Sequence, residues 1–294
     1  MSEIENQILI PVDFSDQSYI ALEQSYNLCK FYNAELTLLY VIEESGPLAK
    51  LFVAPIDEDT LKKEVERRLR ELAGETEKAK NIKINTMVAR GSVYEKILEV
   101  ADLINAKMII MGTNGTVGLK KKFIGSNALR VVRESKCPVI TLKGKHHKEG
   151  CKNIVLPIDL TAETREKVGK AIELGKLYGA TIHVVSILFT KDEFVVNKLT
   201  RQMEQAKNAI KKAGVKCTAE MIKAVHGHES LAQSVIDYSN KMDADLIMIM
   251  TQQEGAFHPL FIGSTAQGVI NHSDIPVMSI VPTVKIEVEG FTPY

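Results

Sequence analysis

The sequence lacks the features that would place it in a membrane, on nucleic acid or in an oxidising compartment. No apolar run approaches the ~20 residues that a membrane span needs, and the acidic start MSEIENQILI does not resemble a signal peptide. Basic residues are not in excess, since 37 Lys and Arg balance 37 Asp and Glu, which disfavours nucleic acid or anionic lipid as a partner. The four cysteines form no CxxC pair and are predicted to be reduced thiols. We therefore expect a soluble, cytoplasmic protein with neither a membrane nor a nucleic-acid partner.

The common catalytic motifs are also missing. The chain contains no G-x4-GK[ST] loop, no HExxH, no HRD and no DFG. No Ser–His–Asp or Cys–His arrangement can be recognised from its motifs. These absences favour a binding protein over an enzyme, with weak ATPase activity left open.

The chain does contain a long internal repeat. The stretch NQILIPVDFSD at residues 6–16 returns as KNIVLPIDLTA at residues 152–162, an offset of 146. The stretch FIGSNALRVVRESKCPVITL at residues 123–142 returns as FIGSTAQGVINHSDIPVMSI at residues 261–280, an offset of 138. A period of this length indicates a duplicated domain rather than a solenoid. We predict one domain at 1–147 and a second, shorter in its middle, at 148–294.

Each copy alternates short apolar runs with longer amphipathic ones. In the first copy the pattern predicts strands at 7–12, 35–42, 83–89, 107–112 and 138–142, and helices at 16–32, 57–80, 93–104 and 126–135. Strands that alternate with helices form right-handed βαβ units. Because the strands are almost continuously hydrophobic, both faces of the sheet must be covered. The predicted class is α/β, with a parallel sheet and helices on both faces in each domain.

A glycine-rich stretch, MGTNGTVGLKKKFIGSNA at residues 111–128, follows the fourth predicted strand and ends in a predicted helix. Ligands of doubly wound sheets bind beyond the carboxyl ends of the strands. Glycines let backbone N–H groups converge on an anion, and a helix N-terminus adds further donors. Ser126 is expected to cap the helix or to donate its hydroxyl to a phosphate. Lys120, Lys121 and Lys122 are read as a solvated loop face, with phosphate contact as the alternative.

The glycines carry a resemblance to a known family. Gly112, Gly115, Gly125 and Ser126 spell G-x2-G-x9-G-S, which resembles the nucleotide signature of the universal stress protein family. The stretches ILIPVD, YVIEE, ARGSVYEKIL and CPVITLK resemble that family too. The resemblance implies two Rossmann-like (adenine nucleotide alpha hydrolase-like) domains, each with a five-stranded sheet of order 3-2-1-4-5. It also implies a bound adenine nucleotide, ATP or else ADP or AMP, with Mg²⁺ on the phosphates.

The resemblance further implies a set of nucleotide-binding residues in the first domain. Asp13 would lie beside the adenosine, the backbone of Val41 would border the adenine, and the glycine stretch would hold the ribose and phosphates. From the residues alone, Asp13 could instead be a turn residue and Val41 a core residue. The implied site consists of Pro11, Val12, Asp13, Val41, Met111, Gly112, Thr113, Asn114, Gly115, Gly125, Ser126 and Asn127.

The second copy departs from this pattern. Met250 and Gln253 replace the first two glycines, whereas Gly263, Ser264 and Asp159 remain. We predict that the second domain binds ATP poorly or not at all, and is instead structural or holds a different ligand, because side chains at the two lost positions would crowd the backbone approach to a phosphate. His226, His228 and His258 fall at the same predicted edge of the sheet. A metal site there is the less favoured interpretation, and unrelated loop histidines are the favoured one.

Three hypotheses for function remain. The leading one is a stress-response protein that senses or buffers ATP without turning it over. The second is a slow ATPase or self-phosphorylating protein with Ser126 or Thr113 as acceptor, and the third is an oligomerisation scaffold with a structural nucleotide. In each, the two halves are expected to pack as an intrachain pseudo-dimer, with a homodimer of tandem chains and an unidentified protein partner as further expectations. The tail at 283–294 alternates like an additional strand.

Overall fold

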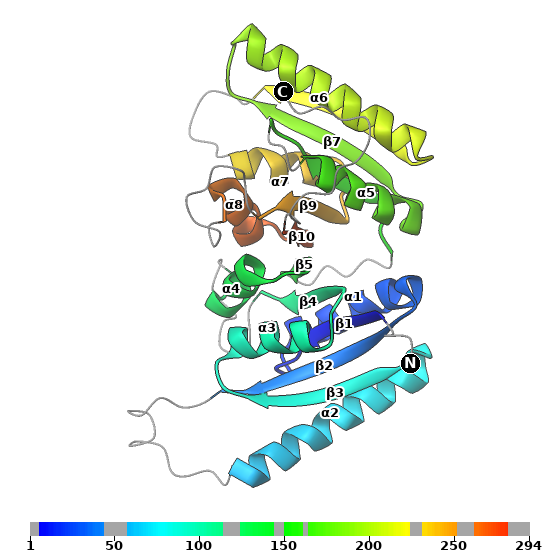
Figure 1. The fold of residues 1–294 in the computed structure, drawn as a ribbon, viewed down its shortest axis with the longest axis vertical. Helices are drawn as coiled ribbons and strands as arrows, with labels where there is room; N and C mark the ends of the chain where they lie inside the picture. Colours follow the sequence, from blue (N-terminus) through cyan, green and yellow to red (C-terminus); the bar gives the residue numbers. More distant parts are fainter. Residues whose placement is uncertain are drawn as a thin grey trace. The chain divides into compact units, whose positions relative to one another are not determined.

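The computed structural model describes residues 6–43, 58–113, 124–143, 150–160, 164–223, 231–251 and 262–281. The chain divides into two compact units, Met1–Glu149 and Gly150–Tyr294 (Figure 1). No helix in the described ranges is long and apolar enough to cross a membrane. All four cysteines lie within these ranges and are free thiols. The predicted tail strand at 283–294 lies outside the described residues.

The first unit alternates strands and helices along the chain. Its elements are β1 (Asn6–Pro11), α1 (Asp16–Tyr32), β2 (Ala34–Ile42), α2 (Glu58–Lys80), β3 (Ile84–Arg90), α3 (Val93–Leu103), β4 (Met108–Gly112), α4 (Ser126–Glu134) and β5 (Val139–Leu142). The strands are parallel and lie in the order β3-β2-β1-β4-β5.

The second unit repeats this arrangement. Its elements are β6 (Asn153–Pro157), α5 (Thr164–Tyr178), β7 (Thr181–Leu188), α6 (Glu193–Lys212), β8 (Lys216–Lys223), α7 (Leu231–Lys241), β9 (Leu246–Met250), α8 (Ser264–His272) and β10 (Val277–Ile280). Its parallel strands lie in the order β8-β7-β6-β9-β10. The predicted fold class, two Rossmann-like α/β domains, is confirmed.

The core of each unit lies on both faces of its sheet. In the first unit α1 packs on β1, β2 and β4 and α2 packs on β2 and β3, while α3 and α4 lie together on the other face (Figure 1). The residues of the central strand are fully buried from Ile8 to Ile10. A strand buried on both faces needs apolar residues at successive positions, which explains the run ILI.

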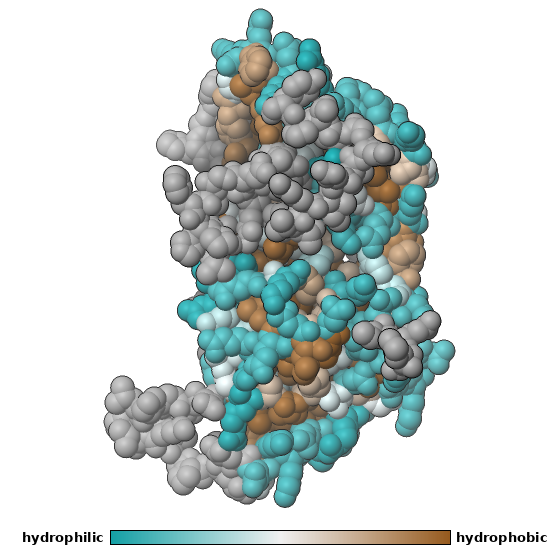
Figure 2. Space-filling model, in the orientation of Figure 1, coloured by the Kyte–Doolittle hydropathy of each residue, from teal (hydrophilic) through white to brown (hydrophobic). Residues whose placement is uncertain are grey.

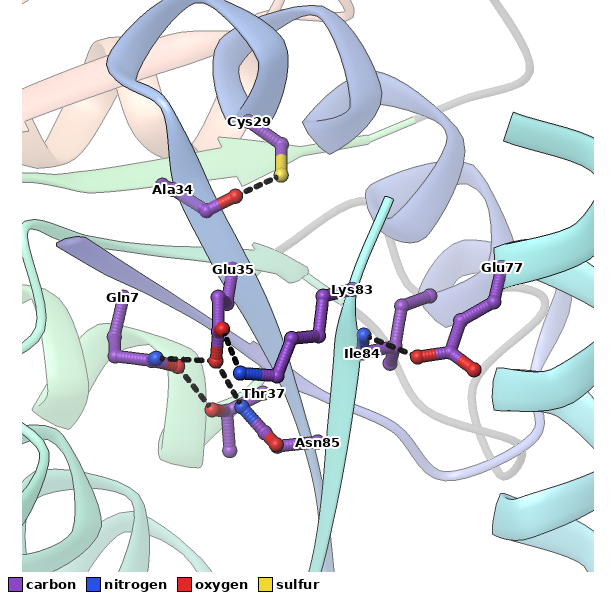
Figure 3. Close-up of polar contacts among 9 residues, drawn as sticks. All are labelled: Gln7, Cys29, Ala34, Glu35, Thr37, Glu77, Lys83, Ile84 and Asn85. Atoms are coloured by element: carbon purple, nitrogen blue, oxygen red, sulfur yellow. Dashed lines mark hydrogen bonds and ion pairs between the residues drawn. The ribbon is translucent and has the colours of Figure 1, made fainter. Parts of the chain in front are cut away.

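The amino ends of β1, β2 and β3 are joined by a polar cluster in the first unit (Figure 3). The buried carboxylate of Glu35 accepts hydrogen bonds from the amides of Gln7 (3.0 Å) and Asn85 (2.8 Å) and pairs with Lys83. Cys29 lies next to this cluster and donates its thiol to the carbonyl of Ala34. Burial, together with the Glu35 charge, raises the pKa of the Cys29 thiol to about 11, so Cys29 is an unreactive core residue.

Helix α2 carries a dense set of charges on its outer surface. Figure 2 shows hydrophilic (teal) residues at the foot of the view, where Figure 1 places α2. Arg67 bridges Glu64 and Glu71 one turn on either side of it. The inner face of α2 is apolar, and Val65 and Leu69 are buried. The helix is therefore held to the sheet by one apolar stripe and solvated elsewhere.

Candidate functional site

Three strands of the first sheet end at the same level, and this brings the sequence-predicted residues together. In the register of β1 and β2, Pro11 pairs with Leu39, and the Val12 N–H continues the ladder to the Leu39 carbonyl at 2.8 Å. Two residues further on, this register brings Asp13 level with Val41. Val12 is buried and Val41 is half-buried. Because β4 pairs with β1 in the same register, Met111 and Gly112 lie at this edge too.

The turn after β1 is built around Asp13. The Ser15 N–H donates to Asp13 Oδ1 at 3.0 Å, and the Ser15 hydroxyl accepts the Ser18 N–H at 3.3 Å, which makes Ser15 the N-cap of α1. Asp13 is only half-buried. The turn role that the sequence left open for Asp13 is therefore present in the structure.

The ends of the glycine stretch are attached to each other. The Thr113 N–H donates to the Leu142 carbonyl at 2.9 Å, which continues the β4–β5 ladder. The Thr113 carbonyl accepts the Gly125 N–H at 2.7 Å. A Cβ added to Gly125 would lie 3.0 Å from that carbonyl. The start of α4 is thus fixed directly above the end of β4, and Gly125 permits this close approach.

Helix α4 begins without a side-chain cap. Its N-cap is Gly125, with φ −64° and ψ 150°, and this residue supplies no side-chain cap bond to the helix. Ser126 is the first helical residue and is exposed, and Asn127 follows it half-buried. Of the two roles predicted for Ser126, the cap belongs to Gly125, because its extended backbone takes the N-cap position, and the contact to a phosphate stays a prediction. An uncapped helix start offers unpaired N–H donors and the positive end of the helix dipole to an anion.

The structure gives Gly112 a role that sequence reasoning missed. A Cβ at Gly112 would lie 2.7 Å from the Cβ of Gln17 and 3.1 Å from its backbone carbon. The first turn of α1 therefore crosses directly over the end of β4, and only glycine allows this. No local pattern indicates this contact, because the two residues are far apart in the chain and Gln17 is not a typical packing residue.

Several sequence-predicted residues cannot be placed. Asn114 and Gly115, the lysines 120–122 and the three histidines 226, 228 and 258 lie outside the described residues. Within the described ranges, no three His, Cys, Asp or Glu side chains converge as a metal site.

The second unit keeps the backbone frame of this edge. The Thr251 N–H donates to the Ile280 carbonyl at 3.0 Å, and the Thr251 carbonyl accepts the Gly263 N–H at 3.3 Å. Helix α8 has Gly263 as its N-cap and, like α4, has no side-chain cap bond. The Ile158 N–H bonds the Val185 carbonyl at 2.8 Å, as Val12 bonds Leu39. The frame common to both units is therefore main-chain.

The side chains at this edge differ between the units. Met250 stands where the first unit has Gly112, and it is buried. Lys167, the counterpart of the fully buried Ala21, is also buried. Small residues at these two positions of the first unit are thus replaced by larger buried side chains in the second.

Comparison with known proteins gives matches over nearly the whole chain. The model of the universal stress protein family matches residues 6–143 and again residues 150–280. A universal stress protein of Methanocaldococcus jannaschii is 33% identical over 140 residues, which cover 47% of this chain and 81% of that protein.

Two solved structures extend the comparison. The structure of a universal stress protein from Archaeoglobus fulgidus has a TM-score of 0.74 at 22% identity, covering 95% of this chain and 98% of that one. A universal stress protein from the same organism, solved in complex with dAMP, covers 44% of this chain and 97% of its own, with 25% identity and a TM-score of 0.37.

Proposed function

Because the chain belongs to the universal stress protein family, as the two family-model matches show, we propose that its first unit binds one adenine nucleotide, ATP or else ADP or AMP. The observation that carries the proposal is the uncapped start of α4, held against the end of β4 by the bond between Gly125 and Thr113. Oriented backbone N–H groups in this position suit a phosphate and require no charged side chain.

The adenosine end of the ligand fits the neighbouring strands. Asp13 and Val41 lie level with each other at the ends of β1 and β2. A carboxylate accepts hydrogen bonds from ribose hydroxyls, and a main-chain edge can pair with the polar edge of an adenine. Pro11, Val12 and Met111 form the apolar floor between these polar groups, and Val12 and Met111 are buried.

In this proposal Mg²⁺ enters with the nucleotide rather than in a protein site. The described residues hold no group of three potential metal ligands. Mg²⁺ typically keeps several waters and is held by substrate phosphates with few protein ligands, so such a site is not required. In this proposal the exposed Ser126 hydroxyl at this edge hydrogen-bonds to phosphate.

We propose a binding role rather than catalysis, with slow self-phosphorylation as the second candidate. Thr113 is 3% exposed, and both of its main-chain groups are bonded, which makes its hydroxyl a poor phosphoryl acceptor. Ser126 is exposed at the open start of α4, which favours it as the acceptor if transfer occurs. Incubation with γ-labelled ATP tests this: label that persists in Ser126→Ala would exclude Ser126.

The second unit is proposed to bind no ATP. Met250 fills the position at which the first unit needs glycine, and Lys167 adds a second large buried side chain. The uncapped start of α8 is retained, so a different or smaller anion is the alternative occupant.

The two units are further proposed to pack on each other as an intrachain pseudo-dimer in the cytoplasm. Small-angle scattering from the full chain tests the packing, because two independent domains would give a broader distance distribution.

The binding proposal is tested with a matched pair of variants. Asp13→Asn keeps an oxygen for the Ser15 N–H but removes the charge, and Asp159→Asn makes the same change in the second unit. Hydrogen bonds to charged groups contribute about 1.5–3 kcal/mol, so we expect Asp13→Asn to weaken ATP binding about 10- to 100-fold in calorimetry. Asp159→Asn should bind like the wild type. No ATP binding by the wild-type chain would refute the proposal.

A further inference from the structure

A three-layer stack connects α2 to the turn that carries Asp13. The Phe14 ring lies on the Tyr40 ring, with 5.2 Å between centroids and 29° between planes. The Arg68 guanidinium lies over the Phe14 ring, 4.4 Å from its centroid. Phe14 belongs to the β1–α1 turn, Tyr40 to the end of β2 and Arg68 to α2. The stack thus joins three separate segments next to the proposed nucleotide site.

The backbone of Phe14 indicates that the stack does more than fill space. Phe14 has φ +60°, a left-handed conformation that a bulky residue rarely adopts and that stores strain. This conformation turns the chain between Asp13 and Ser15, whose hydrogen bond sets the position of the carboxylate. Aromatic stacking and a cation over the ring face are the contacts that hold Phe14 in this orientation.

Arg68, the outer layer of the stack, makes a different contact from its neighbour Arg67 on α2. Arg67 is occupied by ion pairs to Glu64 and Glu71 along the helix. Arg68 is also exposed, yet its guanidinium lies against Phe14. The two adjacent arginines of α2 therefore make different contacts. Arg67 can serve as the control for Arg68, because it has the same side chain one position away.

The second unit cannot build this stack. In the repeat, Leu160 stands at the position of Phe14 and Ser186 at that of Tyr40. Ser186 is buried and carries no ring. The unit that keeps the glycine signature is thus also the unit with the aromatic stack.

We infer that Phe14, Tyr40 and Arg68 are positioning residues that hold the Asp13 turn ready for the nucleotide and make α2 respond to its binding. The inference rests on the proposed function, because it assumes a ligand at the Asp13 edge. When the ligand fixes Asp13, Phe14 is fixed with it, and the stack passes this constraint to Arg68. Binding should therefore slow hydrogen exchange along α2, which itself supplies no proposed ligand contact.

The test compares ATP affinity across stack variants. Phe14→Leu and Tyr40→Ser introduce the residues of the second unit, and Arg68→Ala removes the cation. We expect each to weaken ATP binding about threefold to tenfold. Tyr40→Phe and Arg68→Lys keep the ring and the charge and should restore most of the affinity, which a purely structural role would not predict. Arg67→Ala, the control, should bind ATP like the wild type.

Tryptophan fluorescence can follow the coupling between the nucleotide site and α2 directly. The chain contains no tryptophan, so Tyr40→Trp places a single indole in the stack. Its emission should shift saturably with ATP at the affinity measured by calorimetry. The shift should be lost when Arg68→Ala is added, and ATP should slow exchange of α2 amides in the wild type only.

The outcomes separate the two proposals. A wild-type chain that binds no ATP refutes the proposed function and this inference with it. A wild-type chain that binds ATP, with stack variants of unchanged affinity and no ATP-dependent exchange in α2, overturns the inference alone. If Phe14→Leu proves unfolded, Arg68→Ala on the exposed surface of α2 still decides the matter.

Discussion

The two units share a main-chain frame and differ in the side chains that occupy it. At the carboxyl edge, Thr113 and Thr251 make the same two backbone bonds, and both following helices begin at a glycine N-cap. The first unit has Gly112 in contact with Gln17 at the end of β4, where the second places Met250. Duplication therefore preserved the main-chain frame, and the proposed difference in ligand binding rests on a few side chains.

The same contrast appears where two helices cross. In the first unit Arg130 of α4 lies over the Tyr94 ring of α3, 4.6 Å from its centroid. At the matching positions the second unit has Gly268 and Ala232, and a Cβ on Gly268 would lie 2.6 Å from the Ala232 Cβ. One crossing is thus spaced by large side chains and the other is closed by small ones.

Replacing Gly112 by methionine, the residue of the second unit, should have the largest effect on ligand binding. Gly112→Met forces a side chain against Gln17, and overpacking of about 1–3 kcal/mol would displace the turn that holds Asp13. We expect ATP affinity to fall about 100-fold or more.

Wild-type chains should saturate near one nucleotide per chain in equilibrium dialysis, and two per chain would contradict the asymmetry. Met250→Gly combined with Gln253→Gly should raise the plateau.

Enlarging a residue at the crossing of α7 and α8 should have the next largest effect, on the stability of the second unit. Gly268→Val should destabilise the second unit by about 1–3 kcal/mol, because its Cβ meets Ala232. The measurement is the urea midpoint of the second unit, followed by hydrogen exchange of β6 and β9. Adding Ala232→Gly should recover part of the loss. A Gly268→Val chain as stable as the wild type would show that the crossing can widen freely.

The polar cluster at the amino ends predicts a loss confined to the first unit. Glu35→Ala leaves the Gln7 and Asn85 amides without their shared acceptor, at a cost of about 1–3 kcal/mol. Lys83→Ala should cost under about 1 kcal/mol, because the Lys83 side chain is 64% exposed. Chemical denaturation of both variants checks the ratio. Equal losses would mean that the ion pair, not the amides, stabilises the cluster.

The second unit replaces this carboxylate cluster by a histidine, which predicts a small effect of pH. His183 contacts Thr218 at 2.8 Å and Asn153 at 3.1 Å, and burial lowers its pKa below the usual 6.5. As the pH falls below 6.5, the unfolded chain binds a proton at His183 that the folded chain does not bind. The free energy of unfolding therefore decreases until the pH reaches the lower pKa of His183 in the folded chain. Urea midpoints of the second unit at pH 7.5 and 5.5 should show this. The pH dependence should shrink in His183→Gln.

Much of the fold could be predicted from the sequence. The helix at 16–32 has the predicted bounds, and the other first-unit helices begin and end within one residue of theirs. This succeeded because hydrophobic periodicity is local, so each helix is marked by its own residues. The repeat and the glycine spacing identified the family for the same reason.

The candidate site was predicted less completely. Ser126 was expected to cap α4 or to contact a phosphate, but the cap is Gly125, whose N–H bonds the Thr113 carbonyl across the two ends of a loop. The stack of Phe14, Tyr40 and Arg68 escaped notice because its members come from three segments with no shared periodicity. Contacts of this kind depend on where elements lie relative to one another, which no local pattern encodes.

The sequence by itself determined the elements, the duplication and the asymmetry between Gly112 and Met250, since each is written in residue order and spacing. Only the tertiary structure decided why Gly112 must be glycine: α1 crosses the end of β4 with Gln17 in contact. It also decided that the strained turn at Phe14 is held by α2. The physical reason is that close packing acts between residues distant in the chain, and its demands become visible only when the segments are brought together.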